Sequence, residues 1–251
     1  MKLLLDLGNT RCKYAVLEEG RVKKHGIQNY SPFGKIYGVK SLCDQYGEAE
    51  GVVISSVLSE STNSQIQETL ANSGVRNIFF LKSEENSFGV KLAYIDPGAM
   101  GVDRVAALIA VNEMYSGNSC VIDCGTAVTI DALDAEGNHR GGVILPGVVG
   151  MRKALLNDTK VKVNDEKVEF NVMSNTTEAA IHTGSICAVA GGVDYVINRM
   201  VSDYDSFDQI VCTGGGTEQV QEYLSEIHSA KKIHFVDTLV LDGLRVVARD
   251  I

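Results

Sequence analysis

The segment Leu4–Thr10, LLDLGNT, decides the fold class because it recurs later in the chain as Val121–Ala127, VIDCGTA. Both copies are an apolar strand followed by aspartate, one further residue, glycine and a small polar residue. Each copy continues into a second strand and an acidic-glycine turn, at Glu19–Gly20 and at Glu136–Gly137. We therefore expect two halves of similar topology, each opening with an antiparallel meander of strands.

Apolar strands and helical periodicity alternate after the first meander. Strands are expected at 51–57 and 77–81, and helices at 61–72 and 102–115. This alternation predicts an α/β fold, with mixed sheets covered by flanking helices. A break after the last of these helices divides the chain into an N-terminal domain over 1–116 and a C-terminal domain over 117–251.

The composition excludes several classes of protein. Of 251 residues, 45% are hydrophobic, and the net charge of -9 with scattered Lys and Arg argues against a nucleic-acid partner. We find no run of roughly 20 apolar residues that would predict a membrane span. The six cysteines lack a C-x-x-C pair, and the five histidines lack zinc-ligand spacing. We expect a cytoplasmic protein with free thiols.

The two Asp-x-Gly turns, Asp6–Gly8 and Asp123–Gly125, suit phosphate binding. Glycine lets backbone amides approach a ligand, and phosphate oxygens fit such a cradle. An aspartate beside a polyphosphate acts through Mg²⁺, another cation or water. A third glycine cluster, Thr213–Thr217, follows an expected strand at 209–212. One Asp-x-Gly is more typical of an ordinary turn, but the three clusters together indicate a nucleotide site.

The segment Asp96–Ala110, DPGAMGVDRVAALIA, joins an extended, glycine-rich start to a helix. Its adjacent acid and base, Asp103 and Arg104, lie where that helix begins. Asp103 can accept a hydroxyl proton during attack on a phosphoryl group, and Arg104 can pair with a carboxylate or phosphate. Alternatively, Asp103 only complements the helix dipole and Arg104 is a solvated neighbour.

The order of the three glycine clusters resembles that of the actin-like ATPase superfamily, whose two similar, ribonuclease H-like domains close on ATP. Four segments together are similar to the type III pantothenate kinase family: Asp6–Lys13, Asp96–Arg104, Asp123–Asp131 and Gly137–Gly147. The resemblance extends along nearly the whole chain. It implies a fold of two actin-like domains and a homodimer, to which the apolar helix expected over 179–200 would contribute.

The resemblance also implies roles for individual residues. The ATP-binding residues would be Asp6, Leu7, Gly8, Asn9, Thr10, Arg11, Cys12, Lys13 and Thr126. The pantothenate-binding residues would be Tyr94, Gly101, Val102, Asp103, Arg104 and Thr177, with Asp103 as general base. Adjacent Thr176 is an alternative to Thr177, and Lys13 faces either the phosphates or solvent. Asp123 would bind a monovalent cation.

The implied activity is phosphorylation of pantothenate to 4′-phosphopantothenate, the first step towards coenzyme A. Its cofactors would be ATP with Mg²⁺ and K⁺ or NH₄⁺. Two alternatives remain at this point: a nucleotide-binding regulator without turnover, and a sugar or acetate kinase or a phosphatase of the same superfamily. His139 and His182 are interpreted as structural residues rather than bases.

Overall fold

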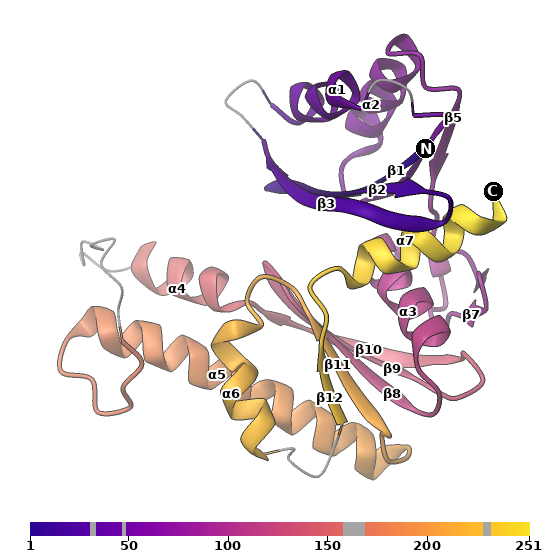
Figure 1. Cartoon of the computed structure of the whole chain (residues 1–251). Coiled ribbons are helices and arrows are strands. Elements are labelled where there is room, and N and C mark those ends of the chain that lie inside the picture. The colour runs from indigo at the N-terminus through magenta and orange to yellow at the C-terminus, as the bar shows by residue number, and fades with distance from the viewer. Residues whose placement is uncertain (31–33, 47–48, 158–168, 228–231) are drawn as a thin grey trace. The chain divides into compact units, whose positions relative to one another are not determined.

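The computed structural model describes residues 1–30, 34–46, 49–157, 169–227 and 232–251. The chain forms two compact units, and each is described by itself (Figure 1). Unit 1 comprises Met1–Ser116 and Thr238–Ile251, and unit 2 comprises Gly117–Asp237. The first break thus lies between Ser116 and Gly117, whereas the last fourteen residues, expected in the second half, return to the first unit.

Unit 1 contains a five-stranded mixed sheet with the strand order β3-β2-β1-β4-β5. Its strands are β1 (Lys2–Leu7), β2 (Arg11–Glu18), β3 (Arg21–Asn29), β4 (Gly51–Ser56) and β5 (Asn77–Phe80). The first three form the antiparallel meander, while β1, β4 and β5 are parallel. All three parallel strands therefore end at the same edge of the sheet, beside the turn that follows Leu7.

Helices cover both faces of this sheet (Figure 1). They are α1 (Lys35–Gln45), α2 (Glu60–Asn72), α3 (Val102–Met114) and α7 (Leu239–Asp250). Leu3, Leu5 and Leu7 alternate along β1 and pack against α1 and α2 in one apolar core. On the opposite face α7 packs against α3 so closely that a Cβ atom at Gly243 would overlap the Ala106 carbonyl. This contact explains why α7 belongs to unit 1 despite its position in the sequence.

Unit 2 repeats the same topology, with the strand order β10-β9-β8-β11-β12. The strands are β8 (Ser119–Cys124), β9 (Ala127–Leu133), β10 (His139–Pro146), β11 (Gln209–Thr213) and β12 (Lys232–Phe235). Again the first three form an antiparallel meander, and β8, β11 and β12 are parallel. The expectation of two similar halves, each a mixed sheet that opens with a meander, is confirmed.

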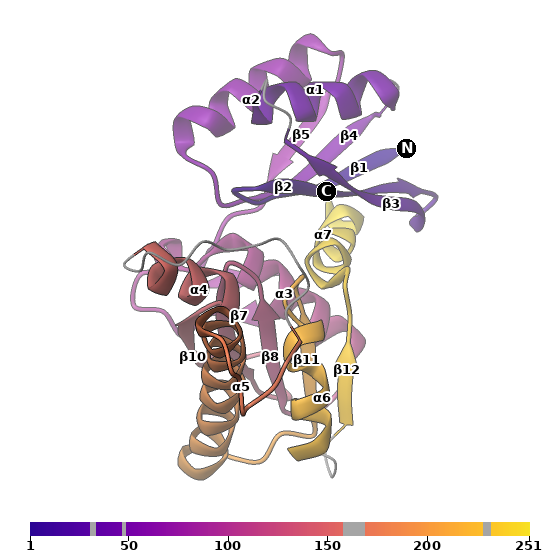
Figure 2. The same cartoon turned by 90° about the vertical axis from the view of Figure 1, so that its left-hand side faces the viewer.

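The helices of unit 2 are α4 (Val148–Asn157), α5 (Thr177–Asp203) and α6 (Glu218–Ile227). Figure 2 shows α4, α5 and α6 together with the sheet of this unit. The buried side chains of α5 and α6 pack against β8, β9 and β11 in one apolar core. By length and composition, α5 would be long and apolar enough to cross a membrane, the one such helix among the described residues. This is weak support for a span, because a core helix of a soluble protein passes the same test.

A short segment of unit 1 leads into α3. It contains the two-residue strands β6 (Asn86–Ser87) and β7 (Val90–Lys91) and the single 3₁₀ turn η1 (Pro97–Ala99). The expectation that this stretch is extended is confirmed for Asp96 and Met100 but is wrong for Pro97–Ala99, which form the turn. Asp96 caps the turn, because its Oδ1 accepts a hydrogen bond from the Gly98 amide at 3.1 Å.

Candidate active site

The first Asp-x-Gly turn closes between β1 and β2. The Gly8 amide donates to the Arg11 carbonyl at 3.1 Å, and Asp6 lies opposite Lys13 in the strand register. Leu7 and Cys12 point into the apolar core, so strand alternation directs Asp6 and Lys13 to the other face of the sheet. Lys13 thus shares the face of Asp6. Because the side chains of Leu7 and Cys12 are buried, only their backbone is left to meet a ligand.

The second Asp-x-Gly turn closes in the same way between β8 and β9. The Gly125 amide donates to the Ala127 carbonyl at 2.9 Å. Two distant glycine segments pack against this turn: the Gly216 amide donates to the Cys124 carbonyl at 2.7 Å, and the Gly147 amide donates to the Thr126 carbonyl at 3.2 Å. The contribution of Gly147 was missed, although its glycine-rich stretch is visible in the sequence.

Asp123 lies at the centre of this packing. Gly214 has a φ of 96°, and a Cβ atom there would overlap Asp123 Oδ1 and the Cys124 carbonyl. Only glycine therefore allows the third glycine cluster to approach the carboxylate so closely. The cluster leads into α6 through Thr217, whose hydroxyl donates to the carbonyls of Thr213 and Gly214 at 2.6 and 2.7 Å. Asp123 and Thr126 of unit 2 are thus brought together with the Gly214–Gly216 segment.

The acid and base of the Asp96–Ala110 segment occupy the first turn of α3. Gly101 caps this helix, and Asp103 Oδ1 accepts a hydrogen bond from the Arg104 amide at 2.8 Å. A Cβ atom at Gly101 would stand 2.6 Å from Asp103 Oδ1, so glycine makes room for the carboxylate. Asp103 is half-buried at the positive end of the α3 dipole, which stabilises its charged form.

Arg104 is buried, so the interpretation of this residue as a solvated neighbour is wrong. Its Nη1 donates to the Tyr94 hydroxyl at 2.7 Å, and its guanidinium carbon lies 5.5 Å from the centre of the Tyr94 ring. A stacked and hydrogen-bonded guanidinium of this kind is held in one orientation. The structure therefore adds Tyr94 to the adjacent pair of Asp103 and Arg104 that the sequence indicates.

A pocket of about 700 Å³ in unit 1 adjoins this group. It is lined by Ser56–Leu58 at the end of β4, by Leu81–Glu84 after β5, and by Gly98–Val102 at the start of α3. Ligands of α/β sheets bind beyond the carboxyl ends of the parallel strands, and this pocket lies at those ends. Gly101 and Val102 form part of its wall, whereas Ser56 and Leu81–Glu84 were not foreseen from the sequence.

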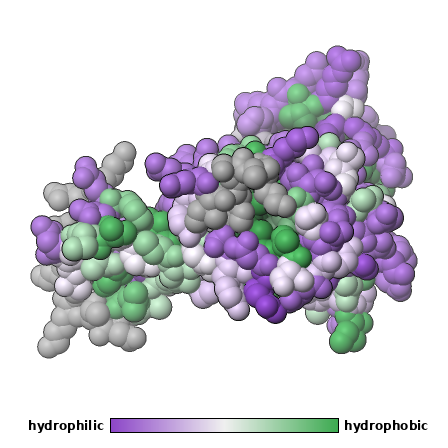
Figure 3. Space-filling model, turned by 90° about the horizontal axis from the view of Figure 1, so that it is seen from below, coloured by the Kyte–Doolittle hydropathy of each residue, from purple (hydrophilic) through white to green (hydrophobic). Residues whose placement is uncertain are grey.

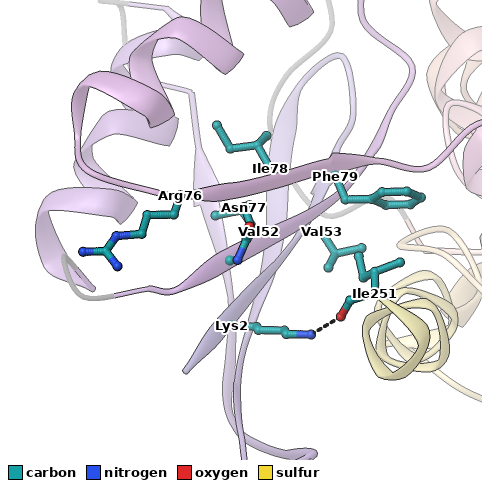
Figure 4. A pocket seen from close by; sticks show the side chains of 9 residues that line it. Lys2, Val52, Val53, Arg76, Asn77, Ile78, Phe79 and Ile251 are labelled. Atoms are coloured by element: carbon teal, nitrogen blue, oxygen red, sulfur yellow. Dashed lines mark hydrogen bonds between the residues drawn. The ribbon is translucent and has the colours of Figure 1, made fainter.

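A second pocket of unit 1, of about 380 Å³, lies at the opposite edge of the same sheet. It is lined by the first residues of β4 and β5, and Figure 4 shows Lys2 donating to the carbonyl oxygen of Ile251. Lys2 Nζ contacts that oxygen at 2.7 Å and the Ala248 carbonyl at 2.8 Å. This second pocket contains none of the expected site residues and lies at the amino ends of the strands. It is therefore not the candidate active site.

Thr177 is the first residue of α5, and its side chain is exposed. The preceding Thr176 caps the helix, because its Oγ1 accepts a hydrogen bond from the Ala179 amide at 3.2 Å. The two threonines therefore differ, because the hydroxyl oxygen of Thr176 already accepts the capping hydrogen bond of α5. Thr177 belongs to unit 2, as do Asp123 and Thr126, whereas the other expected site residues belong to unit 1.

Among the remaining reactive side chains of the described residues, His139 and five of the six cysteines are buried, whereas Cys187 is exposed. His139 Nε2 contacts Asp131 Oδ1 at 2.9 Å, and both side chains are inaccessible to solvent. All six cysteines are free, as expected, and burial raises the pKa of Cys124 to about 12 and that of Cys43 to about 11. No group of three or more His, Cys, Asp or Glu side chains that could hold a metal occurs among the described residues.

Structural comparison places these features on a known fold. An archaeal actin homologue matches with a TM-score of 0.60 at 11% identity and covers 100% of this chain and 99% of its own. A ROK hexokinase from Thermus thermophilus matches with a TM-score of 0.54 at 13% identity over 97% and 96% of the two chains. Identities this low establish the actin-like fold alone.

Sequence comparison gives the family. The family model described as type III pantothenate kinase matches residues 2–199. A type III pantothenate kinase from Hahella chejuensis is 33% identical over 98% of this chain and 97% of its own length. Another, from Nitrosococcus oceani, is 31% identical over 100% of this chain and 94% of its own. The chain therefore belongs to the type III pantothenate kinase family.

Proposed function

We propose that this protein transfers the γ-phosphoryl group of ATP to the primary hydroxyl of pantothenate, giving 4′-phosphopantothenate. The observation that carries this proposal is the group of Tyr94, Asp103 and Arg104 at the start of α3, on an actin-like fold in a chain of the pantothenate kinase family. A nucleotide sensor needs no such base next to an acceptor pocket, and this favours an enzyme over a regulator.

In this reaction Asp103 acts as the general base. The pantothenate hydroxyl oxygen forms a bond to the γ-phosphorus, the bond from that phosphorus to the bridging oxygen breaks, and ADP leaves with the electron pair. The hydroxyl proton passes to the Asp103 carboxylate, whose orientation is supported by the Arg104 amide at 2.8 Å. Arg104 and Tyr94 hold the substrate, while Gly101 and Val102 let it approach the backbone.

ATP would be bound by residues of both Asp-x-Gly turns, namely Asp6–Lys13 and Thr126. Backbone amides contribute much of the attraction, because the chain carries a net charge of -9 and the Leu7 and Cys12 side chains are buried. Asp6 offers a carboxylate to Mg²⁺, which would take its other ligands from the phosphates and water. Lys13, on the same face as Asp6, would offset phosphate charge.

We assign the monovalent cation to Asp123. A carboxylate and a phosphate about 4 Å apart repel each other by roughly 4 kcal/mol at an effective dielectric constant of 20, so a cation is needed between them. Carboxylate and carbonyl oxygens are suitable ligands for such an ion, and the Cys124 carbonyl lies next to Asp123. K⁺ or NH₄⁺ would fill this role beside the Mg²⁺ that accompanies ATP.

Replacing Asp123 with alanine is expected to abolish the activation of turnover by K⁺. The measurement is a KCl titration at constant ionic strength, maintained with a bulky organic cation. The exposed acid Glu222 of α6 provides a matched control, because Glu222→Ala also removes one negative charge from unit 2. An Asp123→Ala variant that responds to K⁺ as the wild type does would exclude this cation site.

The second pantothenate contact is assigned to Thr177 rather than Thr176. Support comes from the capping bond, which occupies the Thr176 oxygen and leaves the exposed Thr177 hydroxyl available. Thr177→Val, which removes the hydroxyl and keeps the shape, should therefore raise the KM for pantothenate.

We further propose a cytoplasmic homodimer that binds neither nucleic acid nor membranes. The net charge of -9 disfavours nucleic acid. Several apolar side chains of unit 2 are exposed around α4 and α5, among them Val149, Leu155, Val172 and Met173. Figure 3 shows apolar side chains gathered at the end of the molecule where α4 and the start of α5 lie. Such a patch favours association with a second copy.

The deciding experiment is an ADP-release assay with ATP, Mg²⁺, K⁺ and a panel of acceptors. We expect ADP formation with pantothenate, at a kcat within the usual range of about 1 to 100 s⁻¹ for kinases, and none above background with a hexose or acetate. Turnover with a sugar or acetate instead would assign the chain a different kinase activity. ATP binding without turnover on any acceptor would favour the regulator.

A further inference from the structure

Val57 is an apolar residue left open to solvent in the wall of the larger pocket of unit 1. That pocket, of about 700 Å³, is also lined by the large apolar residues Leu58, Leu81, Met100 and Val102, which are at most 9% exposed. Val57 is 38% exposed. An exposed valine needs no explanation on an ordinary surface, but one in the wall of a pocket beside a candidate base indicates an apolar contact with the ligand.

Hydrogen bonds fix the short segment that carries Val57. Val57 directly follows β4, and the residues on either side of it are bonded to α2. Ser56 Oγ accepts from the Leu58 amide at 3.2 Å and donates to Asn63 Oδ1 of α2 at 2.6 Å. Asn63 Nδ2 in turn donates to the Leu58 carbonyl at 3.4 Å. The position of Val57 is therefore set before a ligand binds, which lowers the entropy lost on binding.

Val57 also connects the two parts of unit 1 that the proposed reaction uses. Its backbone amide donates to the carbonyl of Leu7, in the first Asp-x-Gly turn, at 3.2 Å. The pocket that it lines is bounded as well by Gly101 and Val102, which immediately precede Asp103. We therefore expect a ligand that occupies this pocket with its hydroxyl at Asp103 to contact Val57 near its hydroxyl end.

Pantothenate has its most apolar group at that end. The carbon that carries its primary hydroxyl is bonded to a carbon with two methyl groups, so these methyl groups lie close to the reacting oxygen. The rest of the molecule contains a secondary hydroxyl, an amide and a carboxylate, which gain little from contact with a valine. Burial of the methyl groups against an apolar side chain is favourable, because it removes apolar surface from water.

We infer that Val57 recognises the geminal dimethyl group of pantothenate and so selects this acceptor over primary alcohols that lack the group. The inference rests on the proposed function, in which Asp103 takes the proton of the neighbouring hydroxyl. Packing against Val57 fixes the carbon next to the one that carries this hydroxyl, and this limits the positions that the oxygen can take near Asp103. Val57 is thus a specificity-determining residue and takes no part in proton transfer.

The test compares pantothenate with its didesmethyl analogue, in which hydrogen replaces both methyl groups. Wild-type kcat/KM should be roughly 10- to 100-fold lower for the analogue, because an apolar pocket typically discriminates about 10-fold or more for each methylene-sized group. Val57→Ala should lower kcat/KM for pantothenate about 5-fold and leave that for the analogue nearly unchanged. In Val57→Phe the ring occupies the space of the methyl groups, so the preference should reverse. The KM for ATP should not change in either variant.

Val22→Ala is the matched control in unit 1. Val22 lies on β3 and is 39% exposed, nearly as much as Val57, but it does not line the pocket. This variant should prefer pantothenate over the analogue as strongly as the wild type does. A Val57→Ala enzyme with an undiminished preference, or a wild type that does not distinguish the two acceptors, would overturn the inference.

A binding measurement reports the contact without turnover and without a folded variant. In wild-type protein labelled with ¹³C at the valine methyl groups, the Val57 signals, identified by their absence in Val57→Ala, should show nuclear Overhauser effects to the methyl protons of bound pantothenate. Their absence at saturating pantothenate contradicts the inference while the kinase assignment stands. If the wild type neither binds nor phosphorylates pantothenate, the proposed function itself fails, and this inference fails with it.

Discussion

Replacing Asp103 with asparagine is expected to lower kcat by about 10²- to 10⁴-fold, the usual contribution of a general base. Asparagine has the same shape, and its oxygen can still accept the hydrogen bond that the Arg104 amide donates to Asp103 Oδ1 at 2.8 Å. The start of α3 should therefore remain folded, and pantothenate should still bind. The variant lacks only a group that takes up the hydroxyl proton during phosphoryl transfer.

The measurement is the rate of ADP release at saturating ATP and pantothenate, together with binding of both ligands. Asp96→Asn is a matched control, because Asp96 is an acid of the same segment. Its carboxylate accepts a hydrogen bond from the Gly98 amide and does not lie at the start of α3. Its kcat should remain within a few fold of the wild type. If Asp103→Asn retained near-normal turnover, Asp103 would serve only as a charge at the helix N-terminus.

The largest expected loss of stability follows from removing Asp131. Its Oδ1 lies 2.9 Å from His139 Nε2, and the two side chains are 3% and 0% exposed. Removing one partner of a buried hydrogen bond typically costs about 1–3 kcal/mol, because the other partner loses that bond away from water. Asp131→Ala should lower the free energy of unfolding by this amount, whereas Asp131→Asn should lose less, since an amide can still bond to the imidazole.

Urea unfolding followed by circular dichroism measures this loss as a shift of the midpoint at constant slope. The comparison is Asp203→Ala, which removes the exposed partner of Arg199 on α5, where the ion pair spans 2.9 Å at 59% and 56% exposure. Exposed pairs contribute about 0–1 kcal/mol. Similar small losses in both variants would mean that the pair of Asp131 and His139 does not stabilise unit 2.

The repeated sheet topology was predictable because its signals are local. Leu4–Thr10 and Val121–Ala127 each contain a strand, a turn and the start of the next strand, and such hairpins depend on neighbouring residues. The return of α7 to unit 1 was not predictable in this way. It depends on the fit of Gly243 against Ala106, two residues far apart in the sequence, and on no signal near either of them.

The features of the candidate site also separate into those with local sequence signals and those that depend on tertiary contacts. The two Asp-x-Gly turns and the segment before α3 were recognisable from residue types and spacing. Their partners were not. Tyr94 contacts Arg104 from the loop that leads into α3, and the approach of Gly214 to Asp123 depends on the pairing of β8 with the distant strand β11. The burial of Arg104 shows the limit of local reasoning, because an arginine next to an aspartate at a helix start is usually solvated.

The position of α7 also bears on the order of synthesis. Unit 2 is one uninterrupted segment, Gly117–Asp237, and all its strands have been translated before α7 appears. Unit 1 is discontinuous, and the face of its sheet that α7 covers stays open to water until Thr238–Ile251 has left the ribosome. Unit 2 can thus fold while unit 1 is still incomplete. On the nascent chain, the exposed apolar surface therefore belongs to unit 1, most of which is translated first.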